Sequence, residues 1–208
     1  MLKRWLTVGI VLTAFRVGPA VATWQNYDRS NGLPSIIVTA LAEDKDENIW
    51  IGTIAGLVRY DGITWTVYRG GDGPPSGSIT SLFCDREGGV WVGTNAGLAR
   101  WNGAGWNTFT TADGLPTNTI ACITQDDEGR IWTGTHDGFQ GTGLGGIARY
   151  DGSTWRSFTT ADGLPSNIVI DAEPGPDGAL WIATQGGVAR YDGTAWTSRP
   201  EVGANWLL

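Results

Sequence analysis

The residues best suited to acid–base chemistry lie in one short segment. The chain of 208 residues contains a single histidine, His136, and Asp137, Phe139 and Gln140 follow it in a glycine-rich stretch. An imidazole acts as a general base only when a partner orients it and a substrate lies within hydrogen-bond distance. Neighbouring positions in sequence do not orient His136 on Asp137, and no second histidine offers a metal site or proton relay. We therefore expect ligand contact here and no catalytic residue, with catalysis by His136 as the alternative.

Two cysteines, Cys84 and Cys122, are the candidate nucleophiles. They fall in corresponding strands of adjacent sequence repeats described below. Stacked sheets lie about 10 Å apart, whereas a disulfide needs Cα atoms about 4.4–6.8 Å apart. We expect two small buried thiols, with a disulfide as the alternative if the strands crowd together at the axis of the fold.

Two acidic clusters, 44–47 and 126–128, are the candidate metal sites. Neither has the Asp-x-Asp-x-Asp-Gly loop with a distal Glu that binds calcium. Solvated turns explain them better, and we assign no metal and no cofactor.

The composition favours a folded β protein. The chain has 32 Gly and 12 Trp, with 41% hydrophobic and 11% aromatic residues. Glycine is about twice its usual share of ~7%, and it destabilises helices. The apolar content excludes disorder.

Residues 1–22 have the anatomy of a secretory signal peptide. Lys3 and Arg4 precede an uncharged, mostly apolar run over 5–15, and Ala20 and Ala22 form an A-x-A cleavage pattern. We expect a periplasmic or secreted protein, with an uncleaved short anchor as the alternative. Without these residues 11 basic and 21 acidic side chains remain, a net charge of −10. Such a surface repels phosphate backbones, so we expect no nucleic-acid partner.

A repeat with a period of 41 residues sets the architecture. Each unit has a Trp in a motif such as Ile-Trp-Ile-Gly-Thr and a second Trp after Arg-Tyr-Asp-Gly. The first series is Trp50, Trp91, Trp132 and Trp181, and the second is Trp24, Trp65, Trp106, Trp155 and Trp196. One arginine also recurs, at Arg59, Arg100, Arg149 and Arg190. Repeated packing preserves such symmetry, so we expect the Trp series in the core between units, and the arginines stacked on Trp or paired with turn carboxylates.

Each unit reads as four short strands. In the first unit we expect strands at 36–43, 49–53 and 57–60 and a fourth with Trp65 and Tyr68, with Asp61-Gly62 supplying the positive φ angles of a tight hairpin. Four strands per 41 residues are typical of a β-propeller blade. The predicted fold is an all-β propeller of four-stranded antiparallel blades, at about 32–70, 73–111, 114–160 and 163–200.

Trp24 to Tyr27 resembles a fourth strand with no unit of its own. We therefore predict four blades plus an orphan N-terminal strand, in an open or truncated ring. An open arc exposes two apolar blade faces, so we expect self-association or a partner chain that completes the ring.

The third unit has eight extra residues between Trp132 and Arg149. They fall in the connection between its second and third strands, which shares a face with the Gly-Leu-Pro loops between blades. Insertions in repeats tend to map to the binding face. We expect His136, Asp137, Phe139 and Gln140 to contact ligand, and also Trp101, which replaces a repeated Tyr. The alternative is a glycine-rich loop without a ligand.

The pattern Gly-Leu-Pro-Ser, Ile-Trp-Ile-Gly-Thr, Arg-Tyr-Asp-Gly and Trp resembles the two-component regulator propeller repeat over residues 24–199. The resemblance implies an extracytoplasmic sensor domain of histidine or hybrid kinases, which recognises a small molecule or oligosaccharide, often a carbohydrate breakdown product. A kinase module is the implied partner if the gene continues beyond this chain. Two alternatives stay open: a propeller lyase or hydrolase similar to streptogramin lyases that uses His136, and a passive scaffold or adhesion module.

Overall fold

The computed structural model describes residues 25–69, 73–75, 77–137 and 143–200. This part of the chain forms sixteen strands and two 3-10 turns. Short runs rich in β-branched and aromatic residues form the strands, and glycine-rich segments connect them. Their bounds are β1 (Val38–Glu43), β2 (Ile49–Thr53), β3 (Gly56–Tyr60), β4 (Trp65–Tyr68), β5 (Ile79–Cys84), β6 (Val90–Thr94), β7 (Gly97–Trp101), β8 (Trp106–Phe109), β9 (Ile120–Gln125), β10 (Ile131–His136), β11 (Gly145–Tyr150), β12 (Trp155–Phe158), β13 (Val169–Pro174), β14 (Leu180–Thr184), β15 (Gly187–Tyr191) and β16 (Trp196–Pro200), with η1 (Arg29–Asn31) and η2 (Thr111–Asp113).

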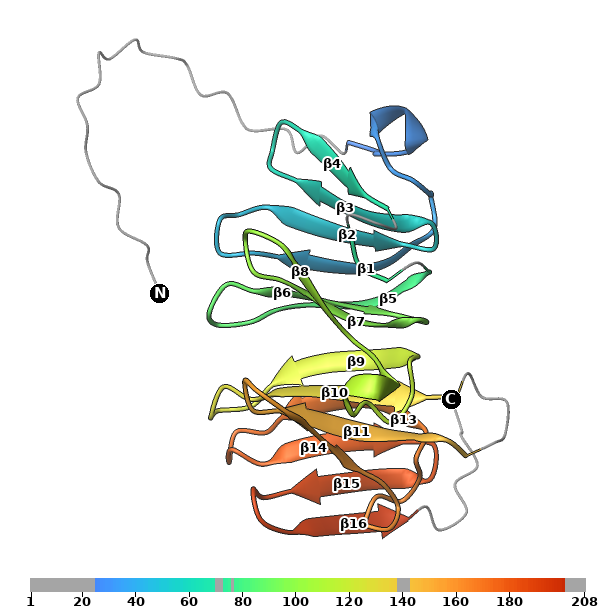
Figure 1. Ribbon diagram of the computed structural model, residues 1–208, viewed down its shortest axis with the longest axis vertical. Coiled ribbons are helices and arrows are strands. Elements are labelled where there is room, and N and C mark those ends of the chain that lie inside the picture. The colour runs from blue at the N-terminus through green and yellow to red at the C-terminus, as the bar shows by residue number, and fades with distance from the viewer. Residues whose placement is uncertain (1–24, 70–72, 76, 138–142, 201–208) are drawn as a thin grey trace, which may run out of the picture.

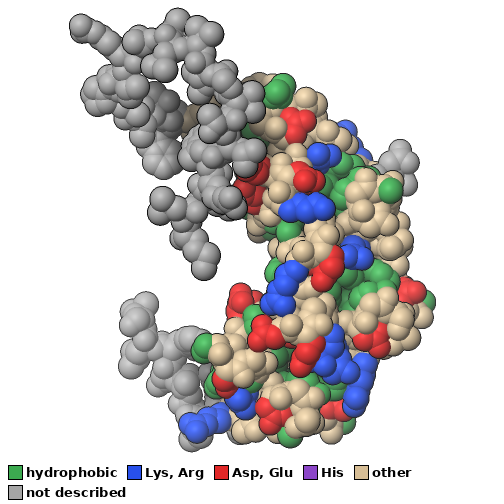
Figure 2. All heavy atoms as spheres, turned by 90° about the vertical axis from the view of Figure 1, so that its left-hand side faces the viewer, with side chains coloured by type: hydrophobic (Ala, Val, Ile, Leu, Met, Phe, Trp, Pro, Cys, Tyr) green, Lys and Arg blue, Asp and Glu red, His purple; other side chains and the backbone are tan. Residues whose placement is uncertain are grey.

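The strands form four antiparallel sheets, each with four strands in chain order from one edge to the other. Each sheet packs on the next through its first strand, so β1, β5, β9 and β13 lie in series. The sheets are stacked along the longest axis, with the first and fourth at opposite ends (Figure 1). Viewed from the side, the described residues form a crescent (Figure 2). The predicted all-β fold with propeller-like blades in an open arc is confirmed.

The predicted strand bounds agree closely with the structure except at the first strand. It begins at Val38 and not at residue 36, and a β-bulge between Val38 and Ala40 shifts the register. The second strand covers 49–53 as predicted.

The predicted orphan N-terminal strand is wrong for the residues that the structure describes. Residues 25–28 form no strand, and a 3-10 turn follows them. A strand is stable only when a neighbouring strand pairs with its backbone hydrogen-bonding groups. Residues 25–28 have no such partner, because the first sheet ends at β4. The ring of Tyr27 instead lies 5.3 Å from that of Trp65. Trp24 lies outside the described residues, as do residues 1–22, the predicted signal peptide.

The hairpins between third and fourth strands have four-residue loops in place of the predicted tight turn. In the first loop only Gly62 has a positive φ, of 91°. The Asp61 carboxylate accepts hydrogen bonds from the backbone N–H groups of Ile63 at 2.9 Å and Thr64 at 2.6 Å. These bonds, that of Thr64 above all, lower the pKa of Asp61. The Asp side chain therefore closes the loop, which explains why Asp or Asn precedes the glycine in all four repeats.

In the first three sheets, the Trp of the second strand is the centre of the interface with the next sheet. Trp50, Trp91 and Trp132 are buried, with 0–1% of their surface exposed. The Trp91 ring stacks on Phe109 of its own sheet at 5.8 Å and meets the edge of Trp155 from the next sheet at 6.2 Å. The prediction of a Trp core between units is confirmed. In the fourth sheet, which no described sheet follows, Trp181 is 44% exposed.

A glycine beside each buried Trp receives a β-branched side chain from the next sheet. A Cβ atom at Gly52 would lie 2.5 Å from Cγ2 of Ile79, and one at Gly93 would lie 2.6 Å from Cγ2 of Ile120. Gly134 and Val169 repeat the contact at 2.4 Å. These distances leave no room for a side chain at the glycine, so the sheets approach as closely as backbone allows.

In the first three sheets, an aspartate in the turn before the second strand holds the buried indole. Its carboxylate accepts the Nε1–H bond in the pairs Asp44–Trp50, Asp85–Trp91 and Asp126–Trp132, at 2.8, 2.8 and 2.6 Å. Burial alone would raise the pKa of Asp44, but hydrogen bonds from Trp50 and Asn48 outweigh it and lower the pKa. A buried indole N–H thus has a partner in each of the first three sheets.

The repeated arginines lie over or beside these groups. Arg100 pairs with Asp85 at 2.8 Å and lies 5.4 Å from the Trp91 ring centre. Arg149 lies 5.6 Å from the Trp132 ring centre, and Arg190 pairs with Asp177 at 2.6 Å. The predicted stacking or carboxylate pairing is confirmed for these three arginines. Arg59 differs, because its guanidinium donates to the side-chain oxygen of Asn48 at 3.2 Å.

The two end faces of the arc differ in chemistry. On the first sheet Val38 and Leu41 are 42% and 65% exposed, and Ile36 just before it is 69% exposed, although the equivalents of Val38 in the other sheets are buried. The outward face of the fourth sheet departs from the pattern of the inner sheets. Ala183 replaces the packing glycine, and Gly175 replaces the turn aspartate. Three charged residues lie opposite the residues of the outward face, in the pairs Asp171–Ala183, Glu173–Trp181 and Arg199–Val188.

We expect Gly93→Ala to destabilise the protein by about 1–3 kcal/mol, because the new methyl group would overpack against Ile120. Urea unfolding of variant and wild type measures the change. Ala183→Gly is the matched control, since it makes the reverse change on the uncovered face, and it should cost less than ~1 kcal/mol. Equal stability of wild type and Gly93→Ala would contradict the close approach of the sheets.

We expect Asp85→Ala to cost about 3 kcal/mol, because it leaves the buried Trp91 indole and the Arg100 guanidinium without their acceptor. Asp127→Ala removes an exposed carboxylate, 3.5 Å from Arg86, and should cost less than about 1 kcal/mol. Thermal unfolding of both variants tests the difference, and similar losses would refute the role of the Asp–Trp–Arg contact.

Candidate functional site

The hairpins between second and third strands end on one face of the arc. In the first sheet the Thr53 hydroxyl donates to the Gly56 carbonyl at 2.8 Å and closes a two-residue turn. In the third sheet the Thr135 hydroxyl donates to the Gly146 carbonyl at 3.1 Å. The same clamp therefore closes the hairpin although eight more residues lie between its ends.

The loops that join successive sheets reach the same face. His136, at the end of β10, donates its backbone N–H to the Thr119 carbonyl at 3.2 Å. The Thr117 hydroxyl donates to the His136 carbonyl at 2.8 Å, and the Asn167 side-chain amide donates to the Gly143 carbonyl at 3.0 Å. The extended hairpin is thus held by the loop before its own sheet and the loop before the next, as the predicted sharing of a face requires.

The structure places the predicted site residues in different positions. His136 and Asp137 are half-buried and lie together where the extended hairpin leaves the sheet. Phe139 and Gln140 lie outside the described residues. The loop residues Thr117, Thr119 and Asn167 were missed by the sequence analysis. The sharing of a face by hairpins and inter-sheet loops was the signal that could have found them.

Trp101 does not join His136 in one site. It pairs with Val90 and Trp106 at the end of β7, whereas His136 pairs with Gly145 at the opposite end of the strands. Its ring lies 5.3 Å from that of Trp106 and 6.1 Å from that of Tyr68. Trp101 is half-buried in the packing between the first two sheets, because its position repeats the core tyrosine that it replaces.

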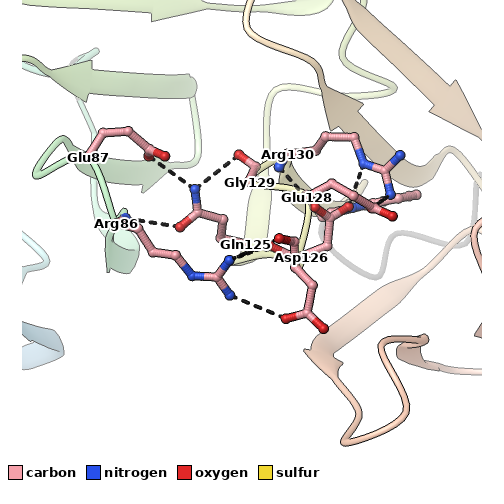
Figure 3. Close-up of polar contacts among 9 residues, drawn as sticks. Arg86, Glu87, Gln125, Asp126, Glu128, Gly129 and Arg130 are labelled. Atoms are coloured by element: carbon pink, nitrogen blue, oxygen red, sulfur yellow. Dashed lines mark hydrogen bonds and ion pairs between the residues drawn. The ribbon is translucent and has the colours of Figure 1, made fainter.

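The opposite face carries a polar network between the second and third sheets (Figure 3). Gln125 is 3% exposed and accepts a hydrogen bond from the Arg86 backbone N–H at 3.0 Å. Its amide donates to Glu87 at 3.1 Å and to the Gly129 carbonyl at 3.0 Å. Every polar atom of the Gln125 side chain is bonded within the protein, which assigns this network to cohesion between sheets.

The cysteines are not placed to act as nucleophiles. Cys84 packs in the interface between the first and second sheets and Cys122 in that between the third and fourth. Both thiols are free, as predicted, although Cys84 is only half-buried. Burial raises the pKa of Cys84 to about 11 and that of Cys122 to about 12. The reactive thiolate is therefore scarce at neutral pH.

The groups around the extended hairpin can form hydrogen bonds and can bind a polar ligand. An imidazole, a carboxylate, hydroxyls and an amide lie there on adjacent connections. Across the residues that the structure describes, no three His, Cys, Asp or Glu side chains come together as a metal site. The same portion of the chain has no helix long and apolar enough to cross a membrane.

Four antiparallel sheets, packed face to face through their first strands, define a repeat protein of the propeller class. The family model "Two component regulator propeller" matches residues 32–55, 73–96 and 114–137. Three of the four repeats therefore match the two-component regulator propeller model, as predicted.

Solved structures with similar folds are larger than this chain. The extracellular domain of a hybrid two-component system from B. thetaiotaomicron is 23% identical with a TM-score of 0.71, and the match covers 82% of this chain and 24% of that one. PorZ, a surface component of the type-IX secretion system of Porphyromonas gingivalis, is 15% identical with a TM-score of 0.60, over 82% of this chain and 27% of PorZ. This chain thus spans about a quarter of the length of each.

A lyase shares the fold as well. Virginiamycin B lyase from Staphylococcus aureus is 19% identical with a TM-score of 0.63, over 79% of this chain and 56% of the lyase. A structure of the same lyase with quinupristin carries a His-to-Ala substitution and is catalytically inactive. A search of curated proteins found no match.

We expect both thiols to react slowly with a disulfide reagent at pH 7, and Cys122 more slowly than Cys84, because it is the more buried of the two. Absorbance of the released thiolate follows the reaction, with the single variants Cys84→Ser and Cys122→Ser assigning each phase. Protein unfolded in urea should react fully and fast. Rapid reaction of native Cys122 would contradict its burial.

Proposed function

We propose that this chain is an extracytoplasmic ligand-recognition module of a two-component regulatory system, without catalytic activity, and that its ligand derives from carbohydrate. Residues 1–22 would direct its export. The membership of its repeats and the shared fold of the two-component extracellular domain support this proposal. A kinase module on the same gene product or on a partner chain would transmit the signal.

The observation that carries the proposal is the extended β10–β11 hairpin. It is the one hairpin of the four with an insertion at this position, and the loops before and after its sheet are hydrogen-bonded to it. A rigid stack of sheets thus presents one irregular, polar segment. Loops on such scaffolds commonly bind ligands, and their hydroxyl, amide and carboxylate groups suit the hydroxyl groups of a sugar.

We expect at least one oligosaccharide in a panel of polysaccharide breakdown products to raise the melting temperature of the wild-type protein, since a ligand that binds only the folded state stabilises it. Asp137→Ala should weaken binding about tenfold by removing a charged hydrogen-bond acceptor. Calorimetric titration measures the affinity.

The matched control is Asp46→Ala, which removes an exposed carboxylate from a turn at the other end of the strands. It should bind within twofold of wild type. No shift with any glycan would contradict ligand recognition and favour a passive scaffold.

The second candidate is a lyase that uses His136. The observation in its favour is that the single His of this chain lies on the irregular hairpin, while a His-to-Ala change accompanies loss of activity in a lyase of similar fold. Incubation with quinupristin, followed by mass spectrometry, tests it. Turnover by wild type that His136→Ala abolishes would establish the enzyme, whereas no turnover by either protein with unchanged glycan affinity would support the sensor.

A further inference from the structure

Three arginines converge on one cleft between the third and fourth sheets, at their outer strands. Arg130, Arg149 and Arg156 line this cleft of about 580 Å³, together with the aromatic rings of Phe158 and Trp196. The chain as a whole has a net charge of −7. A concentration of positive charge is therefore unexpected here.

The equivalent clefts between the other sheets are not positive. That between the first and second sheets is lined by three acidic and three basic side chains, and that between the second and third by four acidic and two basic. The cleft between the third and fourth has three basic side chains and one acidic, Asp162. The Asp162 carboxylate already accepts the backbone N–H of Thr159 at 2.8 Å.

Two of the three arginines have no carboxylate partner. Arg130 pairs with Asp126 at 2.7 Å and also with Glu128. In the second sheet Asp85, the equivalent of Asp126, pairs with the repeated arginine Arg100. In the third sheet Asp126 pairs with Arg130, so the repeated arginine Arg149 lacks this partner. Among the residues that the structure describes, neither Arg149 nor Arg156 has a carboxylate oxygen within 4 Å, and neither guanidinium donates a hydrogen bond.

The two arginines stand directly opposite each other on neighbouring strands, β11 and β12. Like charges in this arrangement destabilise a sheet. The residues equivalent to Arg156 in the other sheets are Thr66, Asn107 and Thr197. Arg156 is therefore charged at a position where the other three sheets have a neutral side chain. Binding of a ligand would explain why the chain keeps a residue that destabilises the sheet.

Aromatic rings position both guanidinium groups. Arg149 Cζ lies 5.6 Å from the Trp132 ring centre, and Arg156 Cζ lies 4.8 Å from that of Phe158. A guanidinium held over an aromatic ring in this way, with no acceptor from the described protein, keeps its N–H bonds available for a ligand. Such a fork fits two oxygen atoms of one carboxylate, sulfate or phosphate group.

We propose that Arg149 and Arg156 bind the oxyanion group of a ligand in this cleft, with Phe158 and Trp196 lining the space for the rest of the molecule. The site is separate from the His136 hairpin: Arg156 lies on β12, the outermost strand of the third sheet, and pairs with Arg149 four residues along β11 from Gly145, the partner of His136. A negative result for the oxyanion site can therefore be told apart from a negative result for glycan binding at the His136 hairpin.

The experiment titrates the whole chain with inorganic phosphate, sulfate and glucuronate by calorimetry at pH 7 and low ionic strength. Arg156→Thr restores the residue that the first and fourth sheets carry. We expect at least one of the three anions to bind, and Arg156→Thr to weaken that binding tenfold or more. A preference for phosphate and sulfate over glucuronate identifies a tetrahedral anion, and the reverse preference identifies a carboxylate.

Arg29→Thr is the control of equal charge change, since Arg29 is exposed in η1 on the first sheet's side of the arc. It should bind within twofold of wild type. Without any anion, Arg156→Thr should melt at or above the wild-type temperature, because it removes the like-charge pair. The proposal is overturned if none of the anions binds, if Arg29→Thr loses as much affinity as Arg156→Thr, or if Arg156→Thr melts below wild type without anion.

Discussion

The close contact of each sheet with the next is the constraint on which the rest of the structure depends. A β-branched side chain at the start of one sheet fills the space over a glycine of the sheet before it, next to a buried Trp. No sheet of four short strands buries both faces by itself, so each is stable only against its neighbours. The Asp–Trp hydrogen bond serves this contact, since it satisfies the one polar atom of an indole that packing removes from water.

This constraint determines where the chain is free to vary. Positions that face another sheet must repeat, and the Trp, Gly, Asp and Arg positions do so in the first three sheets. Hairpin loops and outer strands are released from it. Both sites proposed above occur at such positions: the extended hairpin after β10, and Arg156 on the outermost strand of the third sheet.

The repeat made most of the fold predictable from the sequence. A regular spacing of Trp and Asp-Gly fixes the strand order, because one solution must serve four units. The prediction failed where repetition offered no information: residues 25–28 have no partner strand, and Trp101 looked exceptional although it occupies a core position. Arg149 was read correctly as stacking on a Trp, but its unpaired charge follows from Arg130 occupying Asp126, a competition that only side-chain positions reveal.

Ala183 stands in the fourth sheet where the first three sheets have the packing glycine, so the outward face of the fourth sheet cannot receive another sheet as the inner sheets receive one another. If a second copy approached head to tail, its Val38 would meet the Ala183 methyl group where the inner sheets offer open space, and Asp171 and Glu173 would face apolar side chains. Contacts of this kind, once allowed, add copies without limit and produce fibres. The methyl group and the two carboxylates therefore make the outward face of the fourth sheet a poor fit for the first sheet of a second copy in this head-to-tail arrangement.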